Sequence, residues 1–175
     1  MNTSEIRFLP FNDGLAGAFD RINRAWIEDM FRVEAVDDRV LRYPRETIIN
    51  KGGHIWFAEH VDLGIVGTCA LANKGNGTFE LTKMGVLASA RGLNIGERLL
   101  VYVIGQFEAL GCQQVFLLTN KRCEAAIHLY EKHGFVHDAE VMAEYGASYQ
   151  RCDVAMRYVN TAAPQDKIAQ TGTRA

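Results

Sequence analysis

The sequence predicts an α/β (α+β) fold in which a mixed, mostly antiparallel central sheet of about six to seven strands is flanked by about four helices. Residues 54–87 are expected to form three consecutive antiparallel strands, because their apolar residues follow a strand period and Asn76-Gly77 is a hairpin signal. An apolar stripe at helical spacing follows over residues 95–110. The short apolar run 115–118 is typical of a strand that is covered on both faces.

The segments before residue 54 predict one strand and one helix. Residues 5–9 alternate as a first strand, which Pro10 closes. One helical face then collects large apolar side chains: Leu15, Phe19, Ile22, Trp26 and Met30. Asp13 is the expected cap of this helix. Residues 31–52 are mixed and charged, and Tyr43-Pro44 marks a boundary, since the residue before a proline disfavours helix.

The segments after residue 110 predict a second helix and a final pair of strands. Gly111 ends the long helix, and a shorter helix that contains Tyr130 stops at Gly134. Residues 135–142 and 149–159 are expected to pair as the last strands. Residues 1–160 therefore predict a single domain. The remainder, 161–175, is small and polar and is expected to be a flexible C-terminal tail.

Composition excludes several classes of function. The chain has 175 residues, 48% of them hydrophobic and 23% charged, which fits one ordinary domain. Its net charge of −2 and scattered basic residues give no general attraction for nucleic acid or for a membrane surface. The N-terminus lacks a secretory pattern and no apolar run reaches the ~20 residues of a membrane span, so a cytoplasmic protein is expected.

Cysteine and histidine spacing predicts no metal site. The four cysteines lie far apart without a CxxC pair, and they are expected to be reduced thiols: Cys69, Cys112, Cys123 and Cys152. The five histidines include no HExxH pattern. Walker, dinucleotide-binding and Gly-x-Ser-x-Gly motifs are also absent.

The segment from Glu80 to Phe135 carries the strongest functional pattern. A strand leads into a basic, glycine-containing turn, and the turn leads into a long amphipathic helix. The backbone N–H groups at the start of a helix have no intrahelical partner, and such a site suits an anion such as a pyrophosphate. The sequence therefore predicts a phosphate-bearing cofactor.

Four segments together resemble the GCN5-related N-acetyltransferase (GNAT) family: 80–86, 91–100, 118–120 and 125–135. The likeness extends over residues 54–142. It implies acetyl-CoA as the cosubstrate and a primary amine of a small molecule as the acceptor, with no nucleic acid or membrane partner. By family habit it also implies a homodimer through the last strands.

The resemblance implies a set of cofactor contacts. Backbone groups of Met84 and Val86 would bond to the pantetheine arm, on a strand that splays from its neighbour, while Asn120 would position the cofactor. The N–H groups for the pyrophosphate would come from the turn: Arg91, Gly92, Leu93, Asn94, Ile95 and Gly96. Asn94 replaces the first glycine of the family's turn, and asparagine tolerates the left-handed backbone that the turn needs. Its side chain could cap the helix together with Glu97, or it could crowd the pyrophosphate and weaken binding.

The same resemblance implies direct attack of a neutral amine on the thioester in a ternary complex. A backbone N–H near Met84 would stabilise the oxyanion. Glu80 would take the amine proton, directly or through water, and Tyr130 would bind the cofactor and act as the acid near its sulfur. Alternatively, Glu80 is only a strand carboxylate that pairs with Lys83 or with solvent. The alternative for Tyr130 is an ordinary core tyrosine whose hydroxyl is hydrogen-bonded.

The acceptor site is expected between the first helical region and the last strand loop. The expected substrate-binding residues are Trp26, Glu28, Phe31 and Tyr145, with Asp29, Glu34 and Tyr149 as further lining. A wall of carboxylates and aromatic rings would favour a small cationic amine. Alternatively, Arg32 and Arg42 would clamp the carboxylate of an amino acid.

Two other functions remain open from the sequence. One is a non-catalytic acyl-CoA-binding or sensing module on the same scaffold, which Asn94 favours. The other is acetylation of a protein or peptide amine, which would need an open groove in place of a closed pocket.

Overall fold

One seven-stranded sheet organises the chain in the computed structural model, which describes residues 5–160. The strands are β1 (Ile6–Pro10), β2 (His54–His60), β3 (Gly64–Gly75), β4 (Thr78–Val86), β5 (Gln114–Thr119), β6 (Phe135–His137) and β7 (Val154–Tyr158). The helices are α1 (Ala16–Met30), α2 (Ala35–Arg42), α3 (Pro44–Thr47), α4 (Ile95–Ala109), α5 (Glu124–Lys132) and α6 (Ala139–Tyr145). The predicted fold class and strand number are confirmed.

The order of strands in the sheet is β1-β2-β3-β4-β5-β7-β6. Every neighbouring pair is antiparallel except β4 and β5, which are parallel. The β3–β4 hairpin closes through Asn76 and Gly77, at φ angles of 53° and 75°. These positive angles are the ones that an Asn-Gly hairpin turn requires.

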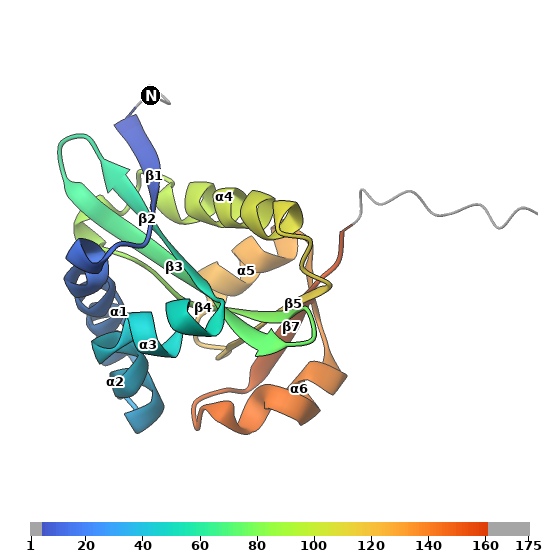
Figure 1. Ribbon diagram of the computed structural model, residues 1–175. Helices are drawn as coiled ribbons and strands as arrows, with labels where there is room; N and C mark the ends of the chain where they lie inside the picture. The colour runs from blue at the N-terminus through green and yellow to red at the C-terminus, as the bar shows by residue number, and fades with distance from the viewer. Residues whose placement is uncertain (1–4, 161–175) are drawn as a thin grey trace, which may run out of the picture.

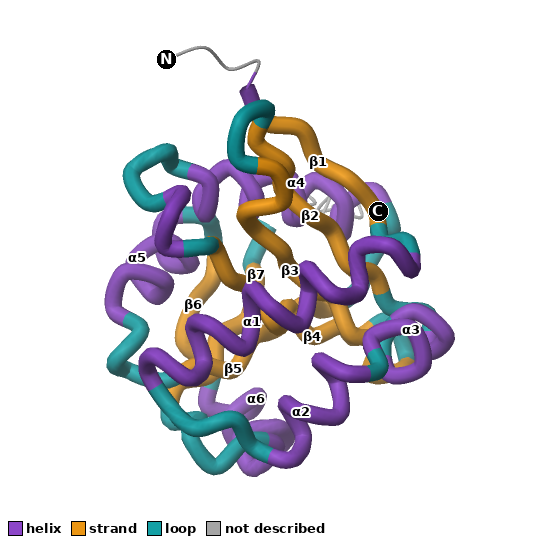
Figure 2. The backbone as a smooth tube through the Cα atoms, turned by 90° about the vertical axis from the view of Figure 1, so that its left-hand side faces the viewer, coloured by secondary structure: helices purple, strands orange, loops and turns teal. Residues whose placement is uncertain are grey.

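Helices cover both faces of the sheet (Figures 1 and 2). On one face, α4 and α5 pack over a core that includes Leu99, Val103 and Tyr130. On the other face, Phe19 and Ile27 of α1 form a second core with the segments around α2 and α3. The helix α6 covers β5 and β7 on a smaller third cluster.

Three local predictions were wrong. The expected strand 135–142 ends at His137, because Asp138 accepts a hydrogen bond from the N–H of Val141 and caps α6 instead. Asp13 does not cap α1; it lies in a 3₁₀ turn and pairs with Arg45. The Asn94 side chain makes no capping bond to α4. The predicted tail lies outside the described residues.

Residues 31–52 form two short helices that the sequence pattern did not separate. Glu34 is the N-cap of α2, and its backbone N–H donates to the Asp37 carboxylate at 2.9 Å. The next helix, α3, has Pro44 in its first turn, where a missing N–H costs nothing. The boundary predicted at Tyr43-Pro44 therefore separates two helices.

Candidate active site

The parallel strands β4 and β5 diverge after four residue pairs. They are paired from Thr78 with Gln114 to Leu81 with Leu117, whereas β4 continues to Val86. At the divergence β4 contains a bulge, where Lys83 has a φ of +50° and the register against β3 shifts. The backbone of residues 82–86 therefore faces the gap, as the sequence predicted for a splayed strand.

A cavity lies at this divergence and encloses about 570 Å³ of empty space that opens to solvent. Its walls come from residues 81–84, residues 117–120, Cys123, Tyr130, Tyr149, Arg151, Cys152, Trp26 and Phe31. The walls join β4, the end of β5, α5, the end of α1 and the loop before β7.

The turn before α4 has the backbone that an anion cradle needs. Gly92 and Asn94 have φ angles of +84° and +57°. The first intrahelical bond runs from the N–H of Arg98 to the carbonyl of Asn94 at 3.2 Å, so the preceding N–H groups have no intrahelical acceptor. A Cβ placed on Gly96 would meet only Val86, at 3.8 Å, and space is thus left above the helix start.

Glu97 lies in the first turn of α4 but is compensated by α5. Its carboxylate contacts Lys132 and, at 2.7 Å, the Nε2 of His133. Hydrogen bonds from Lys132 and His133 lower the pKa of Glu97 to about 2. These contacts tie the start of α4 to the end of α5 and offset a charge that would otherwise oppose an anion.

Tyr130 and Met84 meet at the cavity wall. The Tyr130 hydroxyl lies 3.9 Å from the Met84 sulfur, and the side chain is 8% exposed. Burial raises the pKa of Tyr130, so the phenol keeps its proton at neutral pH. The structure thus brings together the residue expected beside the thioester carbonyl and the residue expected near its sulfur.

Asn120 lines the cavity, but its side chain is used in its own loop. The amide donates to the carbonyl of Arg151 at 2.7 Å and accepts from the N–H of Arg122 at 2.9 Å. Asn120 therefore fixes the loop that follows β5 against the loop that precedes β7.

Glu80 does not line the cavity. Glu80 lies on β4 and is 4% exposed. Its carboxylate lies 3.5 Å from the Nζ of Lys74, which is near the end of the neighbouring strand β3. Burial raises the pKa of Glu80. Glu80 is thus absent from the cavity wall to which Tyr130 belongs, and a bridging water would connect it with the cavity.

Of the predicted acceptor-site residues, Trp26 and Phe31 line the cavity. The Trp26 indole donates to Asn23 at 2.9 Å and lies so close to Gly85 that a Cβ there would meet it at 2.5 Å. Glu28 is instead exposed on α1, and Tyr145 stacks on Phe116, with ring centroids 4.2 Å apart. Neither of these two lines the cavity.

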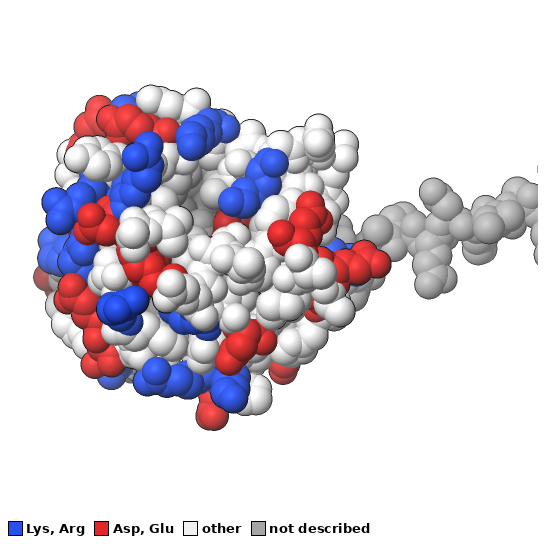
Figure 3. Space-filling view, turned by 90° about the horizontal axis from the view of Figure 1, so that it is seen from below, with Lys and Arg blue, Asp and Glu red and all other residues white. Residues whose placement is uncertain are grey.

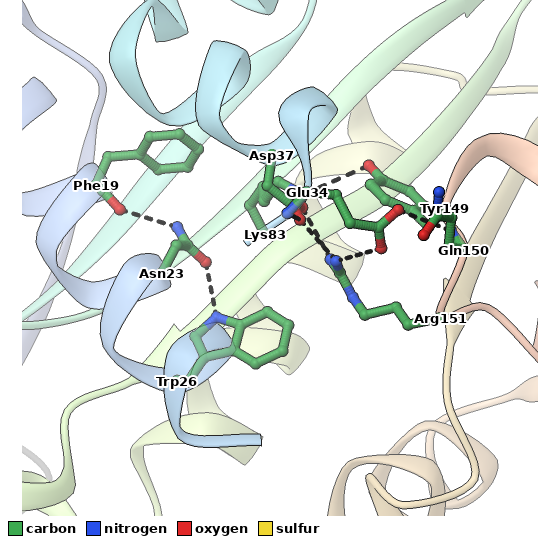
Figure 4. A network of polar contacts seen from close by, with 9 residues as sticks. All are labelled: Phe19, Asn23, Trp26, Glu34, Asp37, Lys83, Tyr149, Gln150 and Arg151. Carbon is green, nitrogen blue, oxygen red and sulfur yellow. Dashed lines mark hydrogen bonds and ion pairs between the residues drawn. The ribbon is translucent and has the colours of Figure 1, made fainter. Parts of the chain in front are cut away.

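The sequence prediction missed a buried network of charges on the acceptor side (Figure 4). The Nζ of Lys83 donates to Asp37 at 2.7 Å and to the Tyr149 hydroxyl at 3.4 Å. Arg151 binds Asp37 with two bonds, of 2.6 and 2.8 Å, and Glu34 with a third, of 3.0 Å. A lysine inside a predicted central strand was the available signal, because lysine is almost never fully buried without a partner.

Asp37 is the centre of this network and is completely buried. Burial by itself would raise the pKa of its carboxyl group. The hydrogen bonds from Arg151 and Lys83 outweigh that effect and hold the pKa at about 2. Asp37 is therefore ionised at neutral pH and fixes both cations in place.

No group of three or more side chains that could hold a metal ion occurs between residues 5 and 160. In the same part of the chain, no helix is both long and apolar enough to cross a membrane.

The fold and the cavity are those of an acetyltransferase family. Residues 51–137 match the family model described as an acetyltransferase (GNAT) domain. The chain belongs to the GNAT family and is an N-acetyltransferase by that membership.

Solved structures share the fold over nearly their whole length. A GNAT acetyltransferase from Staphylococcus aureus Mu50 is 22% identical, with a TM-score of 0.76 over 87% of this chain and 98% of the other. An acetyltransferase from Streptococcus agalactiae 2603 is 17% identical, with a TM-score of 0.73 over 90% and 99%. The Vibrio cholerae spermidine N-acetyltransferase in complex with CoA and spermine is 18% identical, with a TM-score of 0.66 over 90% and 96%. No curated protein matches the chain in sequence.

Proposed function

We propose that this protein transfers the acetyl group of acetyl-CoA to a primary amine of a small molecule, by direct attack in a ternary complex. The observation that carries the proposal is the divergence of β4 and β5 beside an open helix start, with Met84 and Tyr130 at the wall between them. The related spermidine N-acetyltransferase was solved with CoA and spermine, which supports this type of substrate pair.

The residues present fit acetyl-CoA. Backbone N–H groups of residues 92–96 would hold the diphosphate, since the N–H of Arg91 already donates to the carbonyl of Ala88 at 3.2 Å, and the small Gly96 leaves the room for it. Backbone groups of Met84 and Val86 would hold the pantetheine arm along the free edge of β4. When bound, acetyl-CoA supplies a thioester, which an amine can attack without an enzyme nucleophile.

The chain's own groups then handle charge and protons. The N–H of Met84 is proposed to donate to the carbonyl oxygen as negative charge develops on it. Tyr130, which burial keeps protonated, is proposed to give its proton to the departing sulfur. Glu80 is proposed to receive the amine proton through water, since its raised pKa makes it a better base and it does not line the cavity.

A coupled free-thiol assay with acetyl-CoA tests this proposal. The acceptors are polyamines, amino acids, aminoglycosides and short peptides. Release of CoA that depends on a small amine supports the proposal. Binding of CoA without release against any acceptor favours the sensing module instead, and release with peptides alone favours a protein or peptide acetyltransferase.

Two further expectations belong with this proposal. A homodimer through the last strands is checked by light scattering of the purified protein. A cytoplasmic location is checked by fractionation of cells that express it.

A further inference from the structure

The charged side chains on the cavity wall are all basic. Lys83 and Arg151 line the cavity, whereas no Asp or Glu of the described chain does. A third cation stands beside them, because the Arg122 guanidinium lies 4.9 Å from the ring centre of Phe31. Phe31 itself lines the cavity. An acceptor would therefore meet aromatic rings and hydrogen-bond donors of positive charge.

The acidic partners lie behind these cations. The side chains of Asp37 and Glu34 are 0% and 13% exposed. They balance Lys83 and Arg151 in number. Glu80 also acts on Lys83 from outside the cavity wall, and Arg122 is a further cation on the acceptor side. A polyamine or another polycation would find no carboxylate on this wall, and its charges would be desolvated next to cations.

Arg151 is held in an orientation that leaves donors available. Three of the five guanidinium N–H groups are bonded to Asp37 and Glu34. The same guanidinium lies 5.0 Å from the ring centre of Tyr149 and 5.8 Å from that of Phe31. Because the acidic residues fix the guanidinium from behind, an anion on the cavity side would bind it with little loss of side-chain entropy.

The positive charge that an acceptor would meet is confined to the cavity wall. Figure 3 shows a face of the molecule on which basic and acidic side chains are interspersed around a hollow, so this face carries no broad field of one sign. The arginines that the sequence suggested for a carboxylate clamp are not part of the wall. Arg32 is exposed and Arg42 pairs with Asp38 at 2.8 Å.

We propose that the acceptor is a small primary amine that carries a carboxylate, of the amino acid type, and that Arg151 binds this carboxylate with Lys83 and Arg122 as supporting cations. This inference rests on the proposed acetyltransferase function and names the class of its acceptor. The fork of an arginine matches a carboxylate better than a lysine does, which makes Arg151 the specificity-determining residue.

Matched acceptors test the inference with the unmodified protein. Phenylalanine, methionine and lysine are each compared with their α-amides and with their decarboxylated amines, at a pH at which the amino groups are largely neutral. Spermidine is the polycation control. We expect kcat/KM for the free acids to exceed that for the amides and the decarboxylated amines by about tenfold or more. Equal or better turnover of the amides, the decarboxylated amines or spermidine would overturn the inference.

Binding of products separates this inference from the proposed function. If no acceptor releases CoA, the proposed function fails. The N-acetylated amino acids and their amides are then titrated by calorimetry into the protein saturated with CoA. Tighter binding of the acids supports the inference, and equal binding overturns it.

Variants locate the preference. Arg151→Gln should reduce the ratio of acid to amide kcat/KM, mainly through KM, by about tenfold. Arg122→Gln, at an exposed position, should reduce it by less and keeps the test valid if the first variant folds poorly. Arg157→Gln is the matched control, since Arg157 pairs with Asp138 away from the cavity. A merely structural arginine would lower acid and amide turnover equally, and that result overturns the assignment.

Discussion

The proposed cofactor side of the site and its proposed acceptor side differ in what they present to a ligand. The cofactor side is mostly backbone, with residues 82–86 at a free strand edge and the turn 91–96 at a helix start. The acceptor side is mostly side chains, which come from the end of α1 and the loop before β7, and Asp37 of α2 holds Lys83 and Arg151 in place. The cofactor side is formed by local chain geometry. The acceptor side is formed by ion pairs of Asp37 with residues that are distant in sequence: Lys83 is 46 positions away and Arg151 is 114 positions away.

This difference explains how one fold can keep a cosubstrate and change its acceptor. Backbone N–H groups do not depend on the identity of most side chains, so the cofactor side tolerates a residue such as Asn94 in a glycine position. The acceptor side depends on individual charges such as Asp37. Substitutions should therefore affect the two sides in different ways, with larger effects where single charges hold the structure and smaller ones where the backbone does.

The largest effect is expected for Asp37→Ala. It removes the partner of two cations that are largely buried, and breaking such a pair typically costs about 3–5 kcal/mol. The free energy of unfolding in urea measures the loss. The control is Asp38→Ala on the same helix, where solvent-screened pairs with Arg24 and Arg42 contribute much less. Equal losses in the two variants would show that the network does not stabilise the acceptor side.

Tyr130→Phe is expected to reduce kcat by about a hundredfold or more, because an acid catalyst contributes at least that factor. The apparent KM for acetyl-CoA should change much less. Tyr102→Phe, on α4 and stacked on Phe8, removes a hydroxyl elsewhere and serves as the control. An unchanged kcat would remove Tyr130 from the acid role.

The sequence predicted the cofactor side because its signals are local. A strand pattern predicted β4, an apolar stripe at helical spacing predicted α4, and glycine and asparagine residues predicted the turn between them. The hairpin at Asn76-Gly77 was predicted from the same residue types, which adopt positive φ angles. Asn94 adopts the left-handed backbone that was expected, although its side chain does not cap the helix.

The acceptor side was only partly predictable. All four expected substrate-binding residues were placed by the resemblance in fold. Two of them line the cavity, Trp26 and Phe31, whereas Glu28 and Tyr145 do not. No local pattern indicates that Arg151 reaches Asp37, because their pairing depends on how β7 and α2 pack around the sheet. The described residues contain six helices where about four were expected. The sequence did not predict α3 and α6, because they are too short to show a clear helical periodicity.

The pH dependence of the network is the third prediction. The folded-state pKa of Asp37, about 2, is below its ordinary value of 3.8. Asp37 therefore contributes stability at pH values above 3.8, and this contribution, about 2 kcal/mol, is lost as the pH falls through about 2. Carboxyl carbon chemical shifts in an NMR titration should give a midpoint near 2 for Asp37. A midpoint at or above the ordinary value would contradict the proposed pairing.

The smallest effect is expected on the cofactor side, for Gly96→Leu. A side chain here should occupy the space above the helix start and weaken acetyl-CoA binding about tenfold, while the helix gains roughly 1 kcal/mol of propensity. Gly105→Leu is the matched control, because Gly105 lies on the same helix and a Cβ added there would have nothing within 4 Å. Calorimetry and urea unfolding on both variants separate binding from stability. If the two variants bind acetyl-CoA equally, the cradle is not at Gly96.

A crystal structure of the protein with CoA tests the central claim most directly. The account predicts the diphosphate against the N–H groups of residues 92–96 in the turn, and the thiol between Met84 and Tyr130, where β4 and β5 diverge. Density for the nucleotide elsewhere on the molecule, or a turn that stays free of it at saturating CoA, would contradict the account.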